Sequence, residues 1–420
     1  MDNNLKDHKQ IGQELELFFN NEISPGTVFW LPKGMVLFKE LENYIRELTE
    51  KAGYLETSTP IMVKTDLFRQ SGHWDKFGSG GGNDMYNLAI YEPDEVKDGK
   101  TPDVNYTLKP MNCPESTVLY RFRQRSYREL PLRLSEIGRL HRREQSGEVN
   151  GLLRVRQLTM DDAHIFATED QIFDEVGNIL DMMIEFYKGF GFEFDFRLAT
   201  RPELYAGAEE NWKKAEEDLE KALKMKKLKY TLKLKDGAFY GPKIDVHIKD
   251  TLGREWQLAT VQLDFHMPEA FKLEYIDNDG QPKRPVMIHR AIFGSFERFI
   301  AILTEQYQGA FPLWLSPVQV TILPVSDKVA DYARSEYENI KKTGLRAELN
   351  ISDSPIGAKI REATLQKIPY QCIIGEKEKA QSRNGEDFFV SVRSREGKDL
   401  GVQKLDAFLK GLKEDIEKRK

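Results

Sequence analysis

RLHRREQSGEVNGLLRVRQLTMDDAHIF, residues 139–166, is the stretch from which the fold of this 420-residue chain can be inferred. Two runs of alternating side chains, 132–144 and 152–166, flank the turn-forming residues QSGEVNG. This pattern predicts a pair of antiparallel strands in which successive side chains point to opposite faces of a sheet.

One face of the predicted hairpin carries a gradient of charge. On the second strand this face holds Arg154, Arg156, Leu158, Met160, Asp162 and His164. On the first strand, Arg142 and Glu144 share a face. Cations, then an apolar pair, then an acid and an imidazole suit an elongated ligand with an anionic part, a flat apolar part and a polar end. The alternative is that these charges pair with one another on a wet surface, since surface ion pairs are common and weak.

Further runs with strand-like alternation lie on both sides of the hairpin. They cover residues 106–110, 229–235, 243–250 and 254–265. Helical spacing of apolar residues predicts helices from residue 34 to Gly53 and over roughly 170–189, 208–227 and 290–306. Residues 1–313 are therefore predicted to form one α+β domain built on a largely antiparallel sheet. The glycine-rich segment 78–100 lacks the Gly-Lys-Ser/Thr of a phosphate-binding loop, so it is predicted to be a mobile surface loop.

The rhythm changes near residue 317, where strands begin to alternate with helices. VQVTILP, LRAELNI, YQCIIGE and FFVSVRS are predicted strands, and VQKLDAFLKGLKEDI is a predicted closing helix. Residues 317–420 are therefore predicted to form a smaller α/β domain with a mainly parallel or mixed sheet. The first strand-to-helix turn, LPVSDK, lacks the glycines of a dinucleotide site.

The composition is that of an ordinary cytoplasmic protein. Hydrophobic residues make up 40% and charged residues 31% of the chain, and the formal net charge of -6 argues against indiscriminate nucleic-acid binding. We expect no contact with a membrane, because no apolar run has the length of a membrane span. The first twenty residues are too polar and acidic for a targeting presequence. Two cysteines, Cys113 and Cys372, make a disulfide framework unexpected.

Several motifs together resemble the class II aminoacyl-tRNA synthetases. Arg142-x-Glu144 with Arg154 and Asp162 resembles motif 2, MIHRAIFGSFERF (287–299) motif 3, and AGYLETSTPIM (52–62) motif 1. Within that class the chain is similar to the threonyl-tRNA synthetases through SGHW (71–74), KPMNCP (109–114), DDAHIF (161–166), FYGPKID (239–245), TVQLDF (260–265) and MIHRA (287–291). The resemblance runs in order over nearly the whole chain and implies a catalytic domain followed by an anticodon-binding domain.

The resemblance implies that Cys113, His164 and His289 bind one zinc ion, although no metal-ligand spacing is visible in the sequence. Three protein ligands leave coordination positions open for a substrate. Zinc could then bind the amino group and the hydroxyl of threonine, and Asp162 would accept the hydroxyl proton. Valine has no such hydroxyl, and an apolar pocket discriminates near-isosteres by only about a hundredfold. Met160, Tyr240 and Gln262 fall at family positions around the amino acid.

The resemblance also assigns residues to ATP, with Mg²⁺ neutralising the phosphates. Arg142 would bind the α-phosphate, and Arg298 would stack on adenine and reach the γ-phosphate. Glu144, Arg154, Leu158, Gln257 and Thr260 complete the expected ATP site, and Lys243 falls at a further catalytic position. His73 matches a histidine proposed to assist proton transfer from the 2′-hydroxyl of tRNA, whereas an exposed loop histidine is the alternative.

In the C-terminal domain, the expected anticodon-contacting positions are Lys359, Arg361, Glu378, Arg393 and Arg395. The alternative is a solvated charged face. Motif 1 implies a homodimer. The family commonly carries an N-terminal editing domain that clears serine errors, and we expect none in this chain.

The chain departs from the family pattern at Leu158, where an aromatic ring is usual, and at Met160, where glutamine is expected. Glu115-Ser116-Thr117 follow Cys113-Pro114 instead of glycine and histidine. A threonine–tRNA ligase is the favoured interpretation. The alternatives are a non-catalytic paralogue that binds tRNA or protein, and a duplicate ligase specialised for a related hydroxy amino acid.

Overall fold

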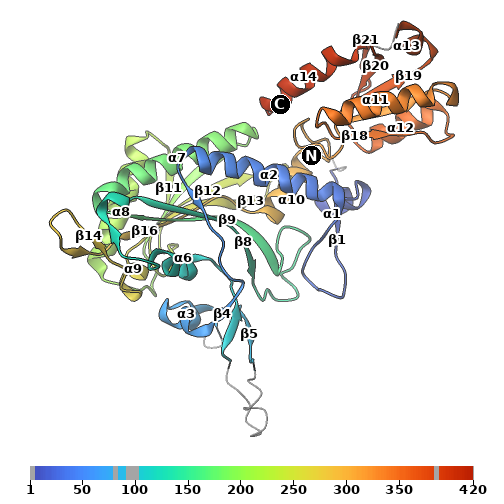
Figure 1. Ribbon diagram of the computed structural model, residues 1–420. Helices are drawn as coiled ribbons and strands as arrows, with labels where there is room; N and C mark the ends of the chain where they lie inside the picture. Colours follow the sequence, from blue (N-terminus) through green and yellow to red (C-terminus); the bar gives the residue numbers. More distant parts are fainter. Residues whose placement is uncertain (1–4, 79–83, 91–103, 383–386, 420) are drawn as a thin grey trace. The chain divides into compact units, whose positions relative to one another are not determined.

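The computed structural model describes residues 5–78, 84–90, 104–382 and 387–419 (Figure 1). The chain divides into two compact units, each of which is described by itself. One consists of residues 1–19, 29–41 and 300–420, and the other of residues 20–28 and 42–299. Among the described residues, no helix has the length and apolar content needed to cross a membrane.

A large sheet forms the centre of the unit that contains residues 42–299. Within the described residues it has eight strands in the order β11-β10-β12-β13-β16-β9-β8-β3 (Figure 1). Their bounds are β3 Leu55–Glu56, β8 Leu132–His141, β9 Gln157–Ala167, β10 Phe194–Ala199, β11 Tyr230–Lys233, β12 Lys243–Lys249, β13 Glu255–Asp264 and β16 Val286–Ser295. All neighbours are antiparallel except β3 with β8 and β10 with β11. The predicted α+β fold on a largely antiparallel sheet is confirmed.

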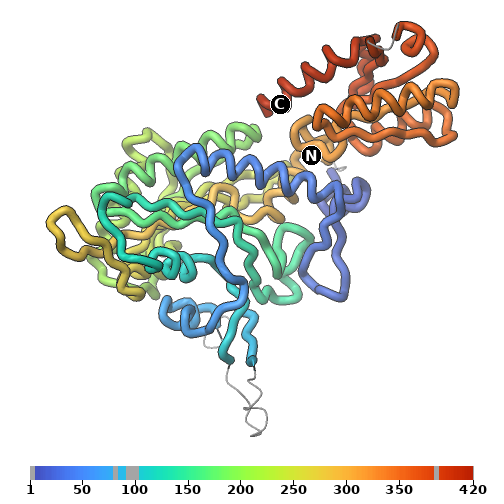
Figure 2. The backbone as a smooth tube through the Cα atoms, viewed as in Figure 1, coloured from blue at the N-terminus to red at the C-terminus, as the bar shows by residue number. Residues whose placement is uncertain are grey.

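Strands from distant parts of the sequence meet at the middle of this sheet. Strand β16 follows β9 by more than a hundred residues in the printed sequence, yet the two lie side by side (Figure 2). Helices α7 (Ile172–Gly189) and α8 (Glu209–Met225) pack on each other and on the sheet. Phe186 of α7 stacks on Phe293 of β16, with ring centroids 5.3 Å apart, and also contacts Phe299. This aromatic cluster joins the helix layer to the central strand.

Shorter elements surround the remaining part of the sheet. They are α3 Thr65–Gln70, α4 His73–Phe77, α6 Cys113–Tyr120, α9 His266–Ala270, and the small strands β4 Met62–Lys64, β5 Tyr86–Leu88, β6 Tyr106–Leu108, β7 Arg125–Ser126, β14 Tyr275–Ile276 and β15 Pro282–Lys283. Helix α2 runs over Pro32–Lys51, and Gly53 follows it with a φ of 76°, as the predicted stop requires.

Three sequence predictions need correction. Strand β8 ends at His141 and β9 begins at Gln157, so the four charged residues Arg142, Glu144, Arg154 and Arg156 lie outside the strands. The helix predicted over 290–306 begins at Phe296 as α10 (Phe296–Gln306), because residues 290–295 pair as the end of β16. In the predicted surface loop 78–100, residues 86–88 form β5, while 79–83 and 91–100 lie outside the described residues.

The other unit contains a mixed sheet of five strands in its described residues, in the order β18-β17-β19-β20-β21. The strands are β17 Val320–Pro324, β18 Ala347–Leu349, β19 Tyr370–Ile374, β20 Phe389–Ser394 and β21 Asp399–Lys404. Helices α11 Ala330–Lys342, α12 Ile356–Leu365, α13 Glu376–Gln381 and α14 Leu405–Glu417 accompany them, with α1 His8–Glu14, β1 Phe18–Phe19 and β2 Phe29–Trp30 in the same unit. The predicted mixed sheet is confirmed. The closing helix predicted from residue 402 begins at Leu405, because residues 399–404 pair with β20.

We predict that Phe186→Ala lowers the free energy of unfolding by about 3–5 kcal/mol, because it leaves a cavity among buried rings. Phe122→Ala is the matched control, since Phe122 is 85% exposed and should change stability little. Urea denaturation followed by circular dichroism measures both. Equal midpoints for the two variants would contradict the role assigned to the aromatic cluster.

Candidate active site

The pairing register of the large sheet places the predicted site residues in two adjacent rows. Directly paired residues point to the same face of a sheet, about 5 Å apart. One row contains Leu134, His164, His289, Gln262 and Lys243, and the next contains Glu136, Asp162, Ala291, Thr260 and Asp245. Histidines from β9 and β16 are therefore direct neighbours, although no sequence spacing relates them.

A cavity of about 210 Å³ lies over these rows. Its lining combines site residues from seven separate segments of the chain, among them His73, Cys113, Arg142, Met160, Asp162, Tyr240, Thr260, Gln262 and His289. Nine residues predicted to take part in catalysis, substrate binding or metal binding thus share one cavity. The structure brings together the amino-acid and metal positions that the resemblance implied.

Cys113, His164 and His289 form a compact group of metal-binding side chains. One ligand atom from each lies within 4.8 Å of the other two, and all three residues are buried. The two imidazole rings stand nearly perpendicular, with centroids 5.0 Å apart. Among the described residues, Nε2 of His164 and Nδ1 of His289 have no hydrogen-bond partner. Buried polar atoms without partners are rare and costly, so this thiol and these two nitrogens fit a divalent metal ion such as zinc.

Asp264 fixes the orientation of His289 from behind. Its Oδ2 lies 2.9 Å from Nε2 of His289, and its Oδ1 accepts backbone N–H bonds from His266 and Met267. A carboxylate that binds the second ring nitrogen is a common support for a metal-binding histidine. Burial lowers the pKa of His164 well below its usual range, so that ring is neutral and able to act as a ligand.

His73 belongs to the cavity and is not an exposed loop residue. It opens α4, is 1% exposed, and its Nδ1 lies 2.8 Å from the hydroxyl oxygen of Ser71. Its ring packs against Phe239 and Tyr240. Burial lowers the pKa of His73 to about 3, with the nearby histidines and Lys76 adding to the effect. The imidazole is therefore uncharged at neutral pH.

A chain of hydrogen bonds links the base of the cavity to β12 and β13. Lys243 pairs with Asp245 at 2.7 Å, and Asp245 accepts a 2.8 Å bond from the hydroxyl of Thr260. The amide of Gln262 donates to that same hydroxyl at 3.1 Å and accepts from the hydroxyl of Tyr240 at 2.5 Å. Each side chain in this hydrogen-bond network is thus held in one orientation by its neighbours.

Arg142, which lines the cavity, and Arg298 produce a positive region beside it. Nε of Arg142 donates to the Pro110 carbonyl, and Nε of Arg298 donates to the Leu153 carbonyl. The Arg298 guanidinium also lies over the Trp256 ring, 5.7 Å from its centroid. Burial lowers the pKa of Arg298, and the charges of Arg142 and Arg154 lower it further. Like charges held together in a partly buried site favour binding of an anion such as a polyphosphate.

Other residues predicted for ATP lie apart from the cavity. Arg154 pairs with Glu144 at 2.7 Å and with Glu148 at 3.3 Å. At this position the charged residues pair with one another at the surface, which was the alternative to ligand binding in the sequence analysis. Leu158 packs with Leu140 and Val155 in a small hydrophobic cluster. Exposed Gln257 pairs across the ladder with His247. Arg156 of the predicted ligand face instead donates to the carbonyl groups of Pro25 and Glu144.

The predicted anticodon positions, which all lie in the other unit, show two kinds of environment. Lys359 is buried and donates to the Pro324 carbonyl, and Glu378 caps α13 by accepting from the Gly375 backbone N–H. Arg395 donates to the Phe311 carbonyl. Arg361 is exposed and Arg393 is half-buried. The first three therefore support the backbone, and Arg361 is the exposed position among the five.

Sequence reasoning missed several acidic residues that hold the site. Asp161 lies on the reverse face of the sheet, pairs with fully buried Arg290, and accepts backbone N–H bonds from Ile292 and Phe293. Glu297 accepts backbone bonds from Thr159 at 2.9 and 3.1 Å. The signal in the sequence was a charged residue inside an otherwise apolar run, as in TMDDAHIF and MIHRAIF.

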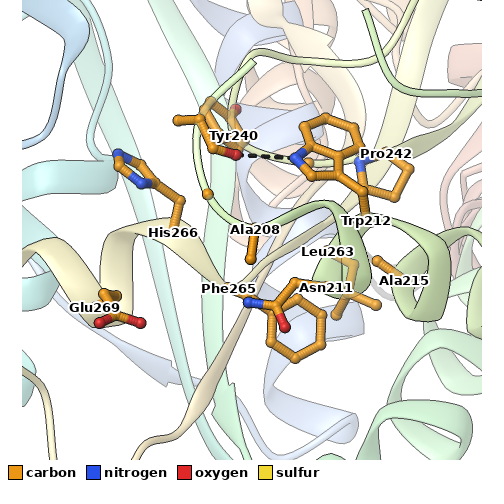
Figure 3. Close-up of a pocket in the computed structure, with 13 residues that line it drawn as sticks. Ala208, Asn211, Trp212, Ala215, Tyr240, Pro242, Leu263, Phe265, His266 and Glu269 are labelled. Carbon is orange, nitrogen blue, oxygen red and sulfur yellow. Dashed lines mark hydrogen bonds between the residues drawn. The ribbon is translucent and has the colours of Figure 1, made fainter.

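A second cavity of about 260 Å³ shares Tyr240 with the first (Figure 3). Trp212 and Pro242 lie on one side of it and His266 and Glu269 on another (Figure 3). The Trp212 indole N–H donates to the Ala206 carbonyl at 2.9 Å. This cavity contains none of the three metal-binding side chains, so the smaller cavity is the candidate active site.

Comparison with known proteins gives a consistent match. Residues 95–307 match the tRNA synthetase class II core domain (G, H, P, S and T), and residues 319–415 match an anticodon binding domain. The chain is 48% identical to the threonine–tRNA ligases of Clostridium kluyveri and of Acetivibrio thermocellus, covering 99% of this chain and 62% of each relative. It thus spans less than two thirds of the length of these curated relatives.

Solved structures agree with this match. A structure titled as the RNA binding domain of threonyl-tRNA synthetase from Cryptosporidium parvum is 38% identical with a TM-score of 0.89, covering 97% of this chain and 98% of that one. A putative threonyl-tRNA synthetase from Aeropyrum pernix is 26% identical with a TM-score of 0.81, covering 99% of this chain and 97% of that one.

We predict that Asp161→Ala lowers the free energy of unfolding by about 3–5 kcal/mol, because it leaves Arg290 buried without its partner. Glu203→Ala is the control: it breaks an exposed pair with Lys235 and should cost at most about 1 kcal/mol. Chemical denaturation provides the comparison, and a loss in Asp161→Ala no greater than in the control would refute the expectation.

Burial raises the pKa of Glu297 to about 7 from an ordinary value of 4.5. The folded state therefore holds the proton more tightly, and this contribution to stability is full below about pH 4.5 and is lost as the pH rises through about 7. We predict that Glu297→Gln, which stays neutral, gains stability relative to the native chain as the pH rises from 5 to 8. Melting temperatures measured across that range test this, and a constant difference between the two proteins would count against it.

Proposed function

Because the chain belongs to the threonyl-tRNA synthetase family of class II tRNA synthetases, we propose that it activates L-threonine with ATP and transfers it to tRNA(Thr). The observation that carries the proposal is the convergence of Cys113, His164 and His289 at the cavity that Cys113, His289 and Asp162 line. A thiol and two imidazoles next to a carboxylate form a site that can recognise an amino group and an alcohol together.

Zinc held by Cys113, His164 and His289 would supply a Lewis acid able to take the amino and hydroxyl groups of threonine. The chain's own residues account for the rest of the selection. Asp162 lies two residues before His164 on β9, in the row next to the His164–His289 pair. Its carboxylate can therefore accept the hydroxyl proton. Valine offers no such proton, whereas serine does, and so this arrangement rejects valine much better than serine.

Activation requires the threonine carboxylate to attack the α-phosphorus of ATP, which forms threonyl-adenylate and releases pyrophosphate. Arg142 lines the cavity and would bind the α-phosphate. Arg298, whose guanidinium lies over the Trp256 ring, would bind the outer phosphates. Mg²⁺ bound with ATP would neutralise further phosphate charge. Gln262 and Tyr240, fixed by their mutual hydrogen bond, would orient the amino acid, while Lys243 and Thr260 support them through Asp245.

In the transfer step, the 2′-hydroxyl of the terminal tRNA adenosine attacks the carbonyl of the adenylate, which forms the aminoacyl ester and releases AMP. Neutral His73 can accept a hydrogen bond from that hydroxyl. With a pKa of about 3, however, His73 is a weak base, so its main contribution would be to orient the hydroxyl. The remaining predicted ATP contacts, Glu144, Arg154, Leu158 and Gln257, would have to approach the nucleotide on binding.

We assign the catalytic role to residues 1–313 and tRNA anticodon recognition to residues 317–420, with Arg361 and Arg393 as the proposed contacts. Arginine can read base edges as well as hold phosphate. The resemblance to motif 1 supports a homodimer, and a role in tRNA charging supports a cytoplasmic location.

Pyrophosphate exchange with threonine, serine and valine tests the proposed activity. We expect fast exchange with threonine, slower exchange with serine, and exchange with valine lower than with threonine by a hundredfold or more. Absence of exchange with every amino acid would favour a non-catalytic paralogue. A preference for another hydroxy amino acid would indicate a specialised duplicate ligase.

Metal content provides the second test. We predict about one zinc per chain in the native protein by elemental analysis, and a large loss of zinc and of threonine exchange in Cys113→Ser, because one metal ligand is weakened. Cys372→Ser is the matched control, since Cys372 is also buried but belongs to the hydrophobic core of the other unit. Equal zinc content in the two variants would remove the metal site from the proposal.

A further inference from the structure

Asn112 joins the segment that carries Cys113 to the strand that carries Asp162. It is the residue immediately before α6 and is 0% exposed. Its side-chain amide does not cap the helix, as asparagine at this position commonly does. Instead, Nδ2 donates a hydrogen bond to Oδ2 of Asp162 at 3.0 Å. A buried amide has thus been directed away from the local backbone and toward the carboxylate of the site.

Gly138 on β8 makes this contact sterically possible. A Cβ atom at Gly138 would lie 2.4 Å from Nδ2 and 2.5 Å from Oδ1 of Asn112, which is far inside van der Waals contact. Gly138 does not have a positive φ, so its backbone conformation does not require glycine. The requirement comes from the close approach of the Asn112 amide.

The hydrogen bond distinguishes the two oxygens of Asp162. Oδ2 is bound to Asn112, whereas Oδ1 lies 3.9 Å from Nε2 of His164. Asp162 itself lines the cavity. With Oδ2 held, rotation of the carboxylate is restricted, and Oδ1 is the oxygen directed toward the metal-binding histidine. A single fixed acceptor is what recognition of one hydroxyl group requires.

We propose that Asn112, in the space left by Gly138, is a positioning residue that fixes the Asp162 carboxylate for recognition of the substrate hydroxyl. This inference rests on the proposed function, because it takes a hydroxy amino acid as the substrate. It assigns a specificity role to a residue that is neither one of the three predicted metal ligands nor one of the predicted phosphate-binding residues.

The role has a distinctive consequence for the three test amino acids. Threonine and serine both carry the hydroxyl that Asp162 would bind, and valine does not. Loss of the Asn112 contact should therefore weaken threonine and serine activation in parallel and leave the slow reaction with valine unchanged. A purely structural role would reduce all three reactions by the same factor.

The test compares three variants of the full chain with the native protein. Asn112→Ala removes the hydrogen-bond donor. Gly138→Ala displaces the Asn112 amide by steric contact, while Asn112 and Asp162 themselves are not mutated. Asn105→Ala is the matched control, since its amide makes two 3.0 Å bonds, to the backbone N–H and carbonyl of Ile90. The measurements are kcat/KM for pyrophosphate exchange with each amino acid, KM for ATP, zinc content and melting temperature.

We expect kcat/KM for threonine and for serine to fall about tenfold or more in Asn112→Ala and Gly138→Ala, as for a lost hydrogen bond to a charged group. The value for valine, KM for ATP and zinc content should stay unchanged, and Asn105→Ala should change none of them. If Asn112→Ala does not fold, Gly138→Ala alone carries the test. An equal fall for all three amino acids, or the same effect in Asn105→Ala, would overturn the proposal.

Crystal structures of the native protein and of Asn112→Ala separate this proposal from the proposed function. A turned Asp162 carboxylate in the variant supports the positioning role, and an unchanged carboxylate overturns it. This comparison remains decisive even if the native chain activates no amino acid. In that case the proposed function fails, while the structural claim is judged on its own evidence.

Discussion

The rest of the site depends on the hydrogen bonds and the ion pair that the buried Asp161 carboxylate makes. The ladder between β9 and β16 is regular as far as Asp162 opposite Ala291 and then shifts, so that Ser295 pairs with Met160. The residues between them form a bulge, and Asp161 accepts the backbone N–H groups of Ile292 and Phe293 there. Arg290 supplies a third donor and balances the charge. Without this acceptor, buried backbone donors and a guanidinium would lose their partner together.

That bulge decides the geometry on both sides of it. Before it, the regular register sets His289 directly against His164. After it, the chain enters α10, whose first turn carries Glu297 and Arg298. Glu297 then binds the backbone of Thr159, which ties the start of the helix back to β9. The positions of His164 and His289, the proposed metal ligands, and the position of Arg298 are therefore consequences of one local irregularity in the sheet.

Burial and charge divide the site into two chemical regions. In the region around Cys113, loss of solvent keeps the imidazoles of His164 and His73 neutral, and a neutral His164 can act as a ligand of a cation. In the region around Arg142 and Arg298, positive charges lie close enough to lower the pKa of Arg298, and Glu144 only partly opposes this effect. The amino acid and the phosphates thus meet different electrostatic environments within one face of a sheet, as the charge gradient in residues 154–164 had suggested. The positive part of the gradient is shorter than expected. Arg154 pairs with Glu144, and Arg156 donates to backbone carbonyl groups.

The sequence by itself determined the local elements with a clear period and a clear stop. Helix α2 with Gly53, the alternation of β9 from Leu158 to Phe166, and the change to an α/β pattern after residue 317 were all predicted correctly, because each depends on neighbouring residues alone. The starts of α10 and α14 were predicted wrongly, because the residues just before these helices pair with β9 and β20. The convergence of Cys113, His164 and His289 was implied by family resemblance, and their spacing in the chain contains no trace of it. Only the tertiary structure decided which oxygen of Asp162 is held, by Asn112 across Gly138, because contacts between separate elements depend on register and packing that no single segment encodes.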